Sequence, residues 1–185
     1  MSVNINPVCP SGCSTLVPSV DFDLCSPSIS FGEIEHVYIA SGDAAPFTSF
    51  EDLAEWTPRL SEDSVDPEAI RDFHVMADLP AASADEIILS LGRKIYSPAS
   101  HIINVDVDDI SDLNYEFGRT TSCNSQYRVW FATESHIYGG NEGILANVNL
   151  RPVIERGQKS INKLTGTISW EAQFSPERGD NPFAS

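Results

Sequence analysis

The sequence predicts a β-rich α+β fold, and three observations carry that prediction. Segments in which apolar and polar residues alternate, as in a half-buried strand, recur along the chain. Only two short segments carry helix-start signals, so strands outnumber helices. The length of 185 residues suits one core, which needs no disulfide or metal ion to be stable.

Alternation or β-branched residues mark each expected strand. These strands are Ile34–Ala40, Phe73–Leu79, Ile87–Leu91, Arg93–Tyr96, His101–Val107, Gln126–Thr133, Ile144–Leu150 and Leu164–Glu171. In the first strand we expect Ile34 on the same face as His36 and Tyr38, with the opposite face partly apolar as well. The glycine-rich segment Tyr138–Gly143 is typical of a turn.

The two helices are expected to be short. A capping box within Thr48–Asp52 precedes the first, which contains Trp56 and is expected to end before Pro58. Ser111 is the expected N-cap of the second helix, and Gly118 lies where its C-terminal cap would be.

The domain organisation follows from composition. Residues 1–30 combine four prolines with Ser, Asn and Cys and contain no Lys or Arg, which predicts an extended N-terminal arm. Residues 31–174 carry the strands and helices and form the β-rich domain. Residues 175–185 are polar and are expected to form an extended C-terminal tail.

The charge of the chain restricts its partners. A net charge of −16 repels phosphate, so a groove that grips DNA or an anionic membrane is not expected. No segment has the length and apolarity of a membrane span, and the N-terminus lacks the pattern of a signal peptide. These features predict a soluble protein that has no membrane partner.

The acidic residues are unevenly distributed. Glu33–Gly92 holds 14 acidic and 2 basic residues, whereas Arg151–Ser185 holds 4 acidic and 5 basic residues. Such asymmetry favours head-to-tail association of copies, and a solvated acidic face is the alternative that the sequence leaves open.

Motifs for catalysis are not apparent. The four histidines lie in or beside expected strands without a catalytic motif, and Cys123 lacks the sequence context of a protease nucleophile. Gly139, Gly140 and Gly143 lead into a strand, not into the helix that a phosphate-binding loop requires. We therefore expect no catalytic residues and no cofactor, and we expect the protein not to be an enzyme.

Two segments resemble metal sites incompletely. Asp106, Asp108, Asp109 and Asp112 are candidate Ca²⁺ ligands, but the Gly and Glu of a helix-loop-helix calcium site are missing. We favour a role at a strand end and a helix start for these aspartates. Cys9, Cys13 and Cys25 form a loose zinc half-site with no nearby His, and we favour unreactive thiols.

Six segments together resemble the major tail tube proteins of tailed bacteriophages, particularly the small ones of phages that infect Bacteroidota. The segments are Phe31–Tyr38, Phe50–Trp56, Leu113–Phe117, Tyr127–Phe131, Tyr138–Gly140 and Leu164–Trp170. They span most of the chain, from about Phe31 to Trp170.

The resemblance implies an antiparallel β-sandwich or small barrel with one or two short flanking helices. It also implies a structural virion protein that stacks as rings, usually hexameric, around a channel through which DNA passes without specific binding. Arms or loops would bridge successive rings. The implied partners are further copies of the chain and other tail proteins, such as the tape measure, terminator or baseplate. The implied location is the virion tail, assembled in the host cytoplasm.

Three alternatives remain open from the sequence. Another virion component, such as a head-to-tail adaptor, a tail terminator or a capsid decoration protein, would have a similar sequence. A soluble metal-dependent enzyme would use the aspartates at 106–112. A carbohydrate-binding β-domain would stack Trp56, Trp130 or Trp170 on a sugar, although buried tryptophans are the expectation we favour.

Overall fold

The computed structural model describes residues 32–61, 63–65, 67–92, 94–121, 126–154 and 161–184. These residues belong to the second of two compact units, Phe31–Ser185. The expected N-terminal arm and Cys9, Cys13 and Cys25 within it lie outside the described residues, as does Cys123.

The described residues form strands, two α-helices and one short 3-10 turn. The strands are β1 (Ile34–Ser41), β2 (Ile70–Asp78), β3 (Glu86–Ile88), β4 (Lys94–Tyr96), β5 (Ala99–Val107), β6 (Gln126–Ala132), β7 (His136–Tyr138), β8 (Ile144–Val153), β9 (Lys163–Ala172) and β10 (Arg178–Asp180). The helices are α1 (Leu53–Leu60) and α2 (Asp112–Thr121), and the 3-10 turn η1 is Ser90–Gly92.

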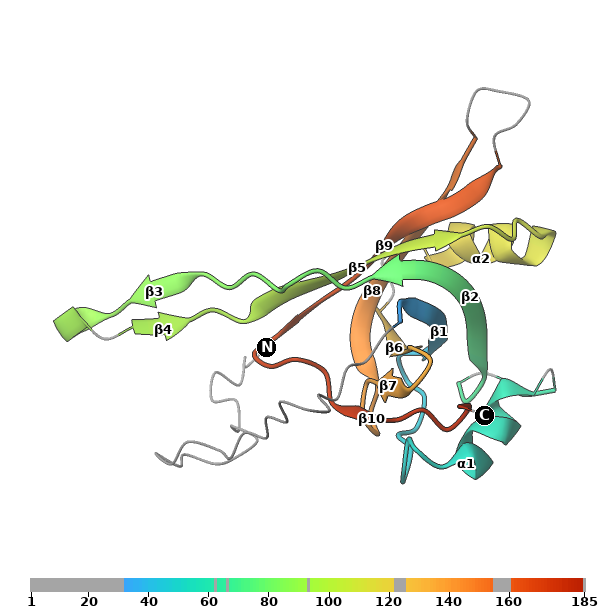
Figure 1. Cartoon of the computed structure of the whole chain (residues 1–185), viewed down its shortest axis with the longest axis horizontal. Coiled ribbons are helices and arrows are strands. Elements are labelled where there is room, and N and C mark those ends of the chain that lie inside the picture. Colours follow the sequence, from blue (N-terminus) through green and yellow to red (C-terminus); the bar gives the residue numbers. More distant parts are fainter. Residues whose placement is uncertain are drawn as a thin grey trace, which may run out of the picture. The chain divides into compact units, whose positions relative to one another are not determined.

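Eight strands form one antiparallel sheet that nearly closes into a ring (Figure 1). The hydrogen-bonded order runs β1, β2, β5, β9, β8, β6, and β6 then pairs back with β1. Strands β7 and β10 continue the sheet beyond β6. The pairing of β2 with β5 covers only Met76–Asp78, so the ring is open beside the first half of β2.

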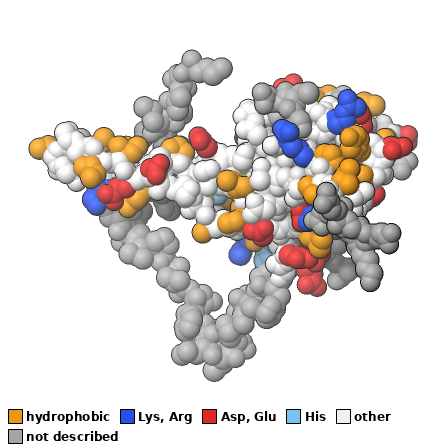
Figure 2. Space-filling model, turned by 90° about the horizontal axis from the view of Figure 1, so that it is seen from above, with side chains coloured by type: hydrophobic (Ala, Val, Ile, Leu, Met, Phe, Trp, Pro, Cys, Tyr) orange, Lys and Arg blue, Asp and Glu red, His pale blue; other side chains and the backbone are white. Residues whose placement is uncertain are grey.

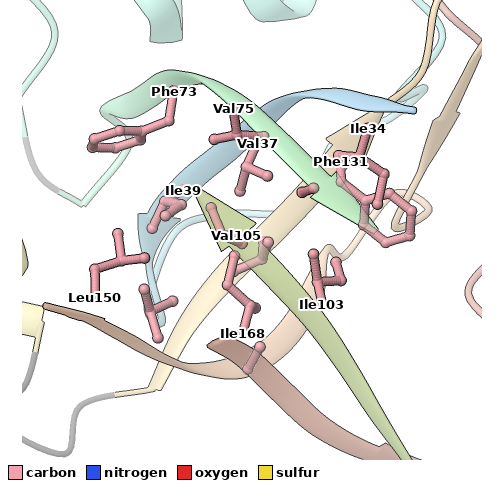
Figure 3. Packing of buried hydrophobic residues seen from close by; sticks show 14 of the residues in the cluster. Ile34, Val37, Ile39, Phe73, Val75, Ile103, Val105, Phe131, Leu150 and Ile168 are labelled. Atoms are coloured by element: carbon pink, nitrogen blue, oxygen red, sulfur yellow. The ribbon is translucent and has the colours of Figure 1, made fainter. Parts of the chain in front are cut away.

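The main apolar core lies inside this ring, and every strand of the ring contributes to it. Alternate side chains point inward, as Figure 3 shows for Val37, Val75, Val105 and Ile168. Each fully buried aliphatic side chain of this size stabilises the fold by roughly 1.5–3 kcal/mol relative to an exposed one.

Helix α2 packs against β8 and covers the open side of the core. Its Phe117 ring lies 4.6 Å from that of Phe73, between the ring centroids, beside the half of β2 that does not pair with β5. The helix lies against β8 at Gly118, where a Cβ would be 3.4 Å from the carbonyl oxygen of Leu150.

A second, aromatic core covers the outer face of β1 and β6. Tyr38 and Trp130 point to this face, where Phe47, Trp56 of α1 and neighbouring residues bury them. The indole N–H of Trp56 donates to the carbonyl of Phe50, and that of Trp130 donates to the carbonyl of Gly140, each at 2.8 Å. Strand β1 is therefore buried on both faces.

The structure confirms the β-rich fold with two short helices, and its nearly closed sheet is the small-barrel form of the expectation. Each predicted strand is present at least in part, and the segment from Tyr138 to Gly143 turns as expected. The strand predicted over Ile87–Leu91 ends at Ile88, because Ser90–Gly92 form the turn η1 at the end of the hairpin. Strands β7 and β10 are not predicted from the sequence, because each has three residues, which is too few to show a period.

One face assignment in β1 is wrong. Ile34 packs in the main core together with Val37 and Ile39, not on the face of His36 and Tyr38. The pairing of β1 with β2 shifts register between Ile34 and His36, and such a bulge exchanges the faces of the residues before it.

Both predicted helix boundaries also need correction. Helix α1 continues through Pro58 to Leu60, and its N-cap is Asp52, whose carboxylate accepts from the N–H of Ala54. Burial of Trp56 holds this helix together despite the hydrogen bond that proline lacks. In α2 the predicted Ser111 cap is present, but the helix runs past Gly118.

Candidate functional site

The largest feature outside the ring is a projecting hairpin, defined here as residues 79–92 and 94–98, which connects β2 to β5. Figure 1 shows it extending well beyond the ring. Strands β3 and β4 pair antiparallel near its end, with Ile87 opposite Ile95. A bridge between Ser83 and Ser100 and an ion pair between Lys94 and Glu86, 2.9 Å long, continue the ribbon.

The projecting hairpin exposes many apolar side chains. Leu91 is 98% exposed, Ile88 68% and Tyr96 58%, and Ile87, Leu89 and Ile95 are exposed as well. Figure 2 shows hydrophobic side chains along this ribbon, at the left of the view. A two-stranded hairpin is marginally stable by itself in water, and exposed apolar patches commonly mark contacts with a partner.

Leu91 at the end of the hairpin has a left-handed backbone conformation, with φ 65° and ψ 21°. It is the one residue other than glycine with positive φ among the described residues. This conformation is unfavourable for a leucine, and the fold gains no burial from its side chain.

A second surface is formed by the outer side of β5, β9 and β8, and we call it the polar face. Asn104 pairs across the sheet with Thr167, which pairs in turn with Asn149, and Ser169 lies beside Asn147. These side chains are exposed or half-buried, while Ile103, Ile168 and Val148 fill the opposite side. The centre of the polar face carries uncharged side chains in a strongly acidic chain.

The predicted metal candidate Asp106 lies at one end of the polar face and is already engaged. The ammonium of Lys163 lies 2.7 Å from its carboxylate, and the hydroxyl of Thr165 donates to the other carboxylate oxygen. The hydrogen bonds from Lys163 and Thr165 lower the pKa of Asp106 below its usual value.

The other three aspartates lie at the start of α2. The carboxylate of Asp109 accepts from the N–H of Ser111, Asp112 is the first residue of the helix, and Asp108 is exposed. Together with Asp106, these residues do not form a group of three metal-ligating atoms near one point within the described part of the chain. Their positions match the strand-end and helix-start roles.

The structure instead brings together three side chains that the sequence does not connect. His36 of β1 lies beside Asp72 and His74 of β2, and one ligand atom from each lies within 4.8 Å of the others. His101 is buried and stacked on Trp170, and His136 contacts the hydroxyl of Ser135. The sequence places one histidine in each of two expected strands, but only the pairing of these strands shows that the two side chains meet.

The tryptophans do not form a binding platform. Trp56 and Trp130 are fully buried in the aromatic core, and Trp170 is buried in the main core. Stacking on a sugar requires an exposed ring face, so the structure does not favour the carbohydrate-binding alternative.

Comparison with known proteins found no matching family model, no matching curated protein and no matching solved structure. Within the described residues, neither α1 nor α2 has the length and apolarity needed to cross a membrane.

Proposed function

We propose that this chain is a structural virion protein, a phage tail tube subunit that stacks as rings around a channel for DNA. The observation that carries the proposal is the projecting hairpin, whose apolar side chains no described part of the chain covers. The resemblance of the sequence to tail tube proteins supplies the form of the assembly, which includes rings that are usually hexameric.

The hairpin is suited to bridging copies of the chain. It is a ribbon that projects from the ring, and its exposed apolar side chains would gain roughly 25 cal/mol for each Å² removed from water. Burial against another copy would supply the contacts that a two-stranded ribbon lacks by itself. In such an assembly each copy would insert its own hairpin into a contact and would also receive the hairpin of a neighbouring copy.

The polar face is our candidate for the wall of the channel. Its central Asn, Thr and Ser side chains carry no positive charge that would hold phosphate, and the chain as a whole repels DNA. The cations on these three strands lie toward one end of the face, where Lys163 is paired with Asp106 and Arg151 of β8 donates to the side chain of Asn149. DNA would therefore pass this surface without specific binding.

Electron microscopy of the purified chain at increasing concentration tests the proposal. The expected result is rings that stack into tubes with an open channel. Monomers at every concentration, and no ring made of this chain in virions, would refute it. Isolated rings that never stack would favour the related role of a tail terminator or head-to-tail adaptor.

A matched pair of variants tests the part played by the hairpin. The double variant Ile88→Asp/Leu91→Asp puts charge on the hairpin, whereas Val65→Asp/Leu113→Asp makes the same change in charge at two exposed apolar residues elsewhere. We expect the first variant to remain folded and monomeric and the second to assemble like the wild type. Equal assembly of both variants would show that the hairpin is not the contact.

A further inference from the structure

The side chains of His36, Asp72 and His74 meet on the outer face of β1 and β2. Antiparallel pairing places His36 directly opposite His74 and Tyr38 opposite Asp72. Asp72 and His74 are two residues apart on one strand, so their side chains share a face. We call these three residues the histidine cluster. Its scaffold is two paired strands that bury Val37, Phe73 and Val75 on the other side.

The contacts within the cluster are close. Nδ1 of His36 lies 2.9 Å from one carboxylate oxygen of Asp72 and 3.2 Å from the other. The rings of His36 and His74 lie 4.2 Å apart between centroids, and His36 also stacks on Tyr38. One ligand atom from each of the three residues lies within 4.8 Å of the other two.

Two imidazoles and one carboxylate are a characteristic ligand set for divalent transition metals. Such ligands bind Zn²⁺ at about 2.0–2.2 Å, so small side-chain rotations would bring the three atoms to one ion. The strands fix the positions of the Cα atoms, and the side chains are half-buried or exposed, so an ion can reach them. We propose that His36, Asp72 and His74 bind one divalent transition-metal ion of the zinc type.

The surroundings favour a cation. His36 and Asp72 line a groove of about 570 Å³ that is also lined by the carboxylates Glu35 and Glu134. Among the described residues that line this groove there is no Lys or Arg. A net charge of −16 further raises the local concentration of cations. Water can occupy the remaining coordination positions.

A simple ion pair between His36 and Asp72 is the competing explanation. That pair accounts for the 2.9 Å contact but assigns no role to His74, whose ring lies beside His36. A metal ion uses both imidazoles in neutral form and neutralises the carboxylate, so it requires all three residues. The two explanations therefore differ in whether the removal of His74 weakens metal binding. The proposed ion site does not depend on the tube function.

The experiment is a titration of the full-length chain with Zn²⁺ by calorimetry and with Co²⁺ by visible absorption. Because thiols also bind these ions, it uses the variant Cys9→Ser/Cys13→Ser/Cys25→Ser/Cys123→Ser as the parent. We expect one ion per chain and a melting temperature that rises with metal concentration. Failure of this parent to bind either ion would overturn the proposal.

Ligand variants of that parent then locate the ion. His74→Ala and Asp72→Asn are each expected to weaken metal binding at least about tenfold. Even the loss of a residue that only hydrogen-bonds to a metal ligand reduces metal affinity by about that factor. His136→Ala removes a histidine outside the cluster and should leave the affinity unchanged. Melting of each metal-free variant checks that it is folded. Unchanged affinity in His74→Ala would place the ion elsewhere and contradict the assignment.

Discussion

Two pairs of isoleucines in antiparallel strands have opposite environments in this protein. Ile103 of β5 faces Ile168 of β9 inside the ring, and both are fully buried. Ile87 of β3 faces Ile95 of β4 in the projecting hairpin, and both are exposed. The same cross-strand pair is thus part of the core in one region and open to solvent in the other. Strand pairing and burial are separate properties, and only the second distinguishes core from contact surface.

The largest expected effect is the loss of a core isoleucine. Ile103→Ala should lower the free energy of unfolding by about 2–5 kcal/mol, because it leaves a cavity in a fully buried position. Ile95→Ala, at a residue that is 46% exposed, should cost under about 1 kcal/mol in the monomer. Urea denaturation of the two variants measures the difference, and equal losses would remove the distinction between the regions.

Replacing a glycine by alanine should also destabilise the ring more than the hairpin. Gly166→Ala would place a Cβ 1.8 Å from the carbonyl oxygen of Asn149 on the neighbouring strand, so we expect a loss of about 1–3 kcal/mol or more. Gly92→Ala meets no atom within 4 Å, but its φ of +72° is strained for alanine, and about 1 kcal/mol is expected. Thermal unfolding of both variants compares a steric clash with backbone strain alone, and a larger loss for Gly92→Ala would contradict the close packing of β8 on β9.

A smaller effect is expected from the ion pair on the polar face. Asp106→Asn should cost about 1 kcal/mol at pH 7, because Lys163 and Thr165 stabilise the charged carboxylate of a partly exposed residue. The folded-state pKa of Asp106 is lowered, so its contribution is present above the unfolded value near 4 and is lost as the pH falls through the folded value. The stability difference between wild type and variant should therefore shrink below about pH 4, as unfolding measured across pH would show. A difference that is constant down to pH 2 would contradict this assignment.

The smallest effect on stability is expected at the end of the hairpin. Leu91→Asn replaces a fully exposed leucine with a residue that adopts the left-handed conformation more readily, so the monomer should change by less than about 0.5 kcal/mol or become slightly more stable. Assembly should weaken at the same time. Denaturation together with sedimentation velocity separates the two readouts, and a clear loss of monomer stability would mean that Leu91 packs within its own chain.

The fold was largely predictable because its strands alternate regularly. Segments such as Leu164–Glu171 and His101–Val107 have enough residues to show a period of two, and the structure places both in the ring. The bulge in β1 and the course of α1 through Pro58 were not predictable, because register and tertiary burial decide them.

The candidate sites were less predictable. The sequence predicts strands at Ile87–Leu91 and Arg93–Tyr96 but not the exposure of their side chains to solvent. A strand-like pattern does not reveal whether another element of the chain covers the strand. The histidine cluster joins residues 36 positions apart, which become neighbours only through the register of β1 and β2. The polar face requires the relative register of three strands.

Hydrogen exchange as a function of protein concentration tests the central claim most directly, because it observes both regions in one sample. Amides of β3 and β4 should exchange rapidly in the dilute monomer and become protected as the protein assembles, whereas β5 and β9 should be protected throughout. Hairpin amides that exchange equally fast in monomers and in assembled protein would contradict the claim that the projecting hairpin is the contact between copies.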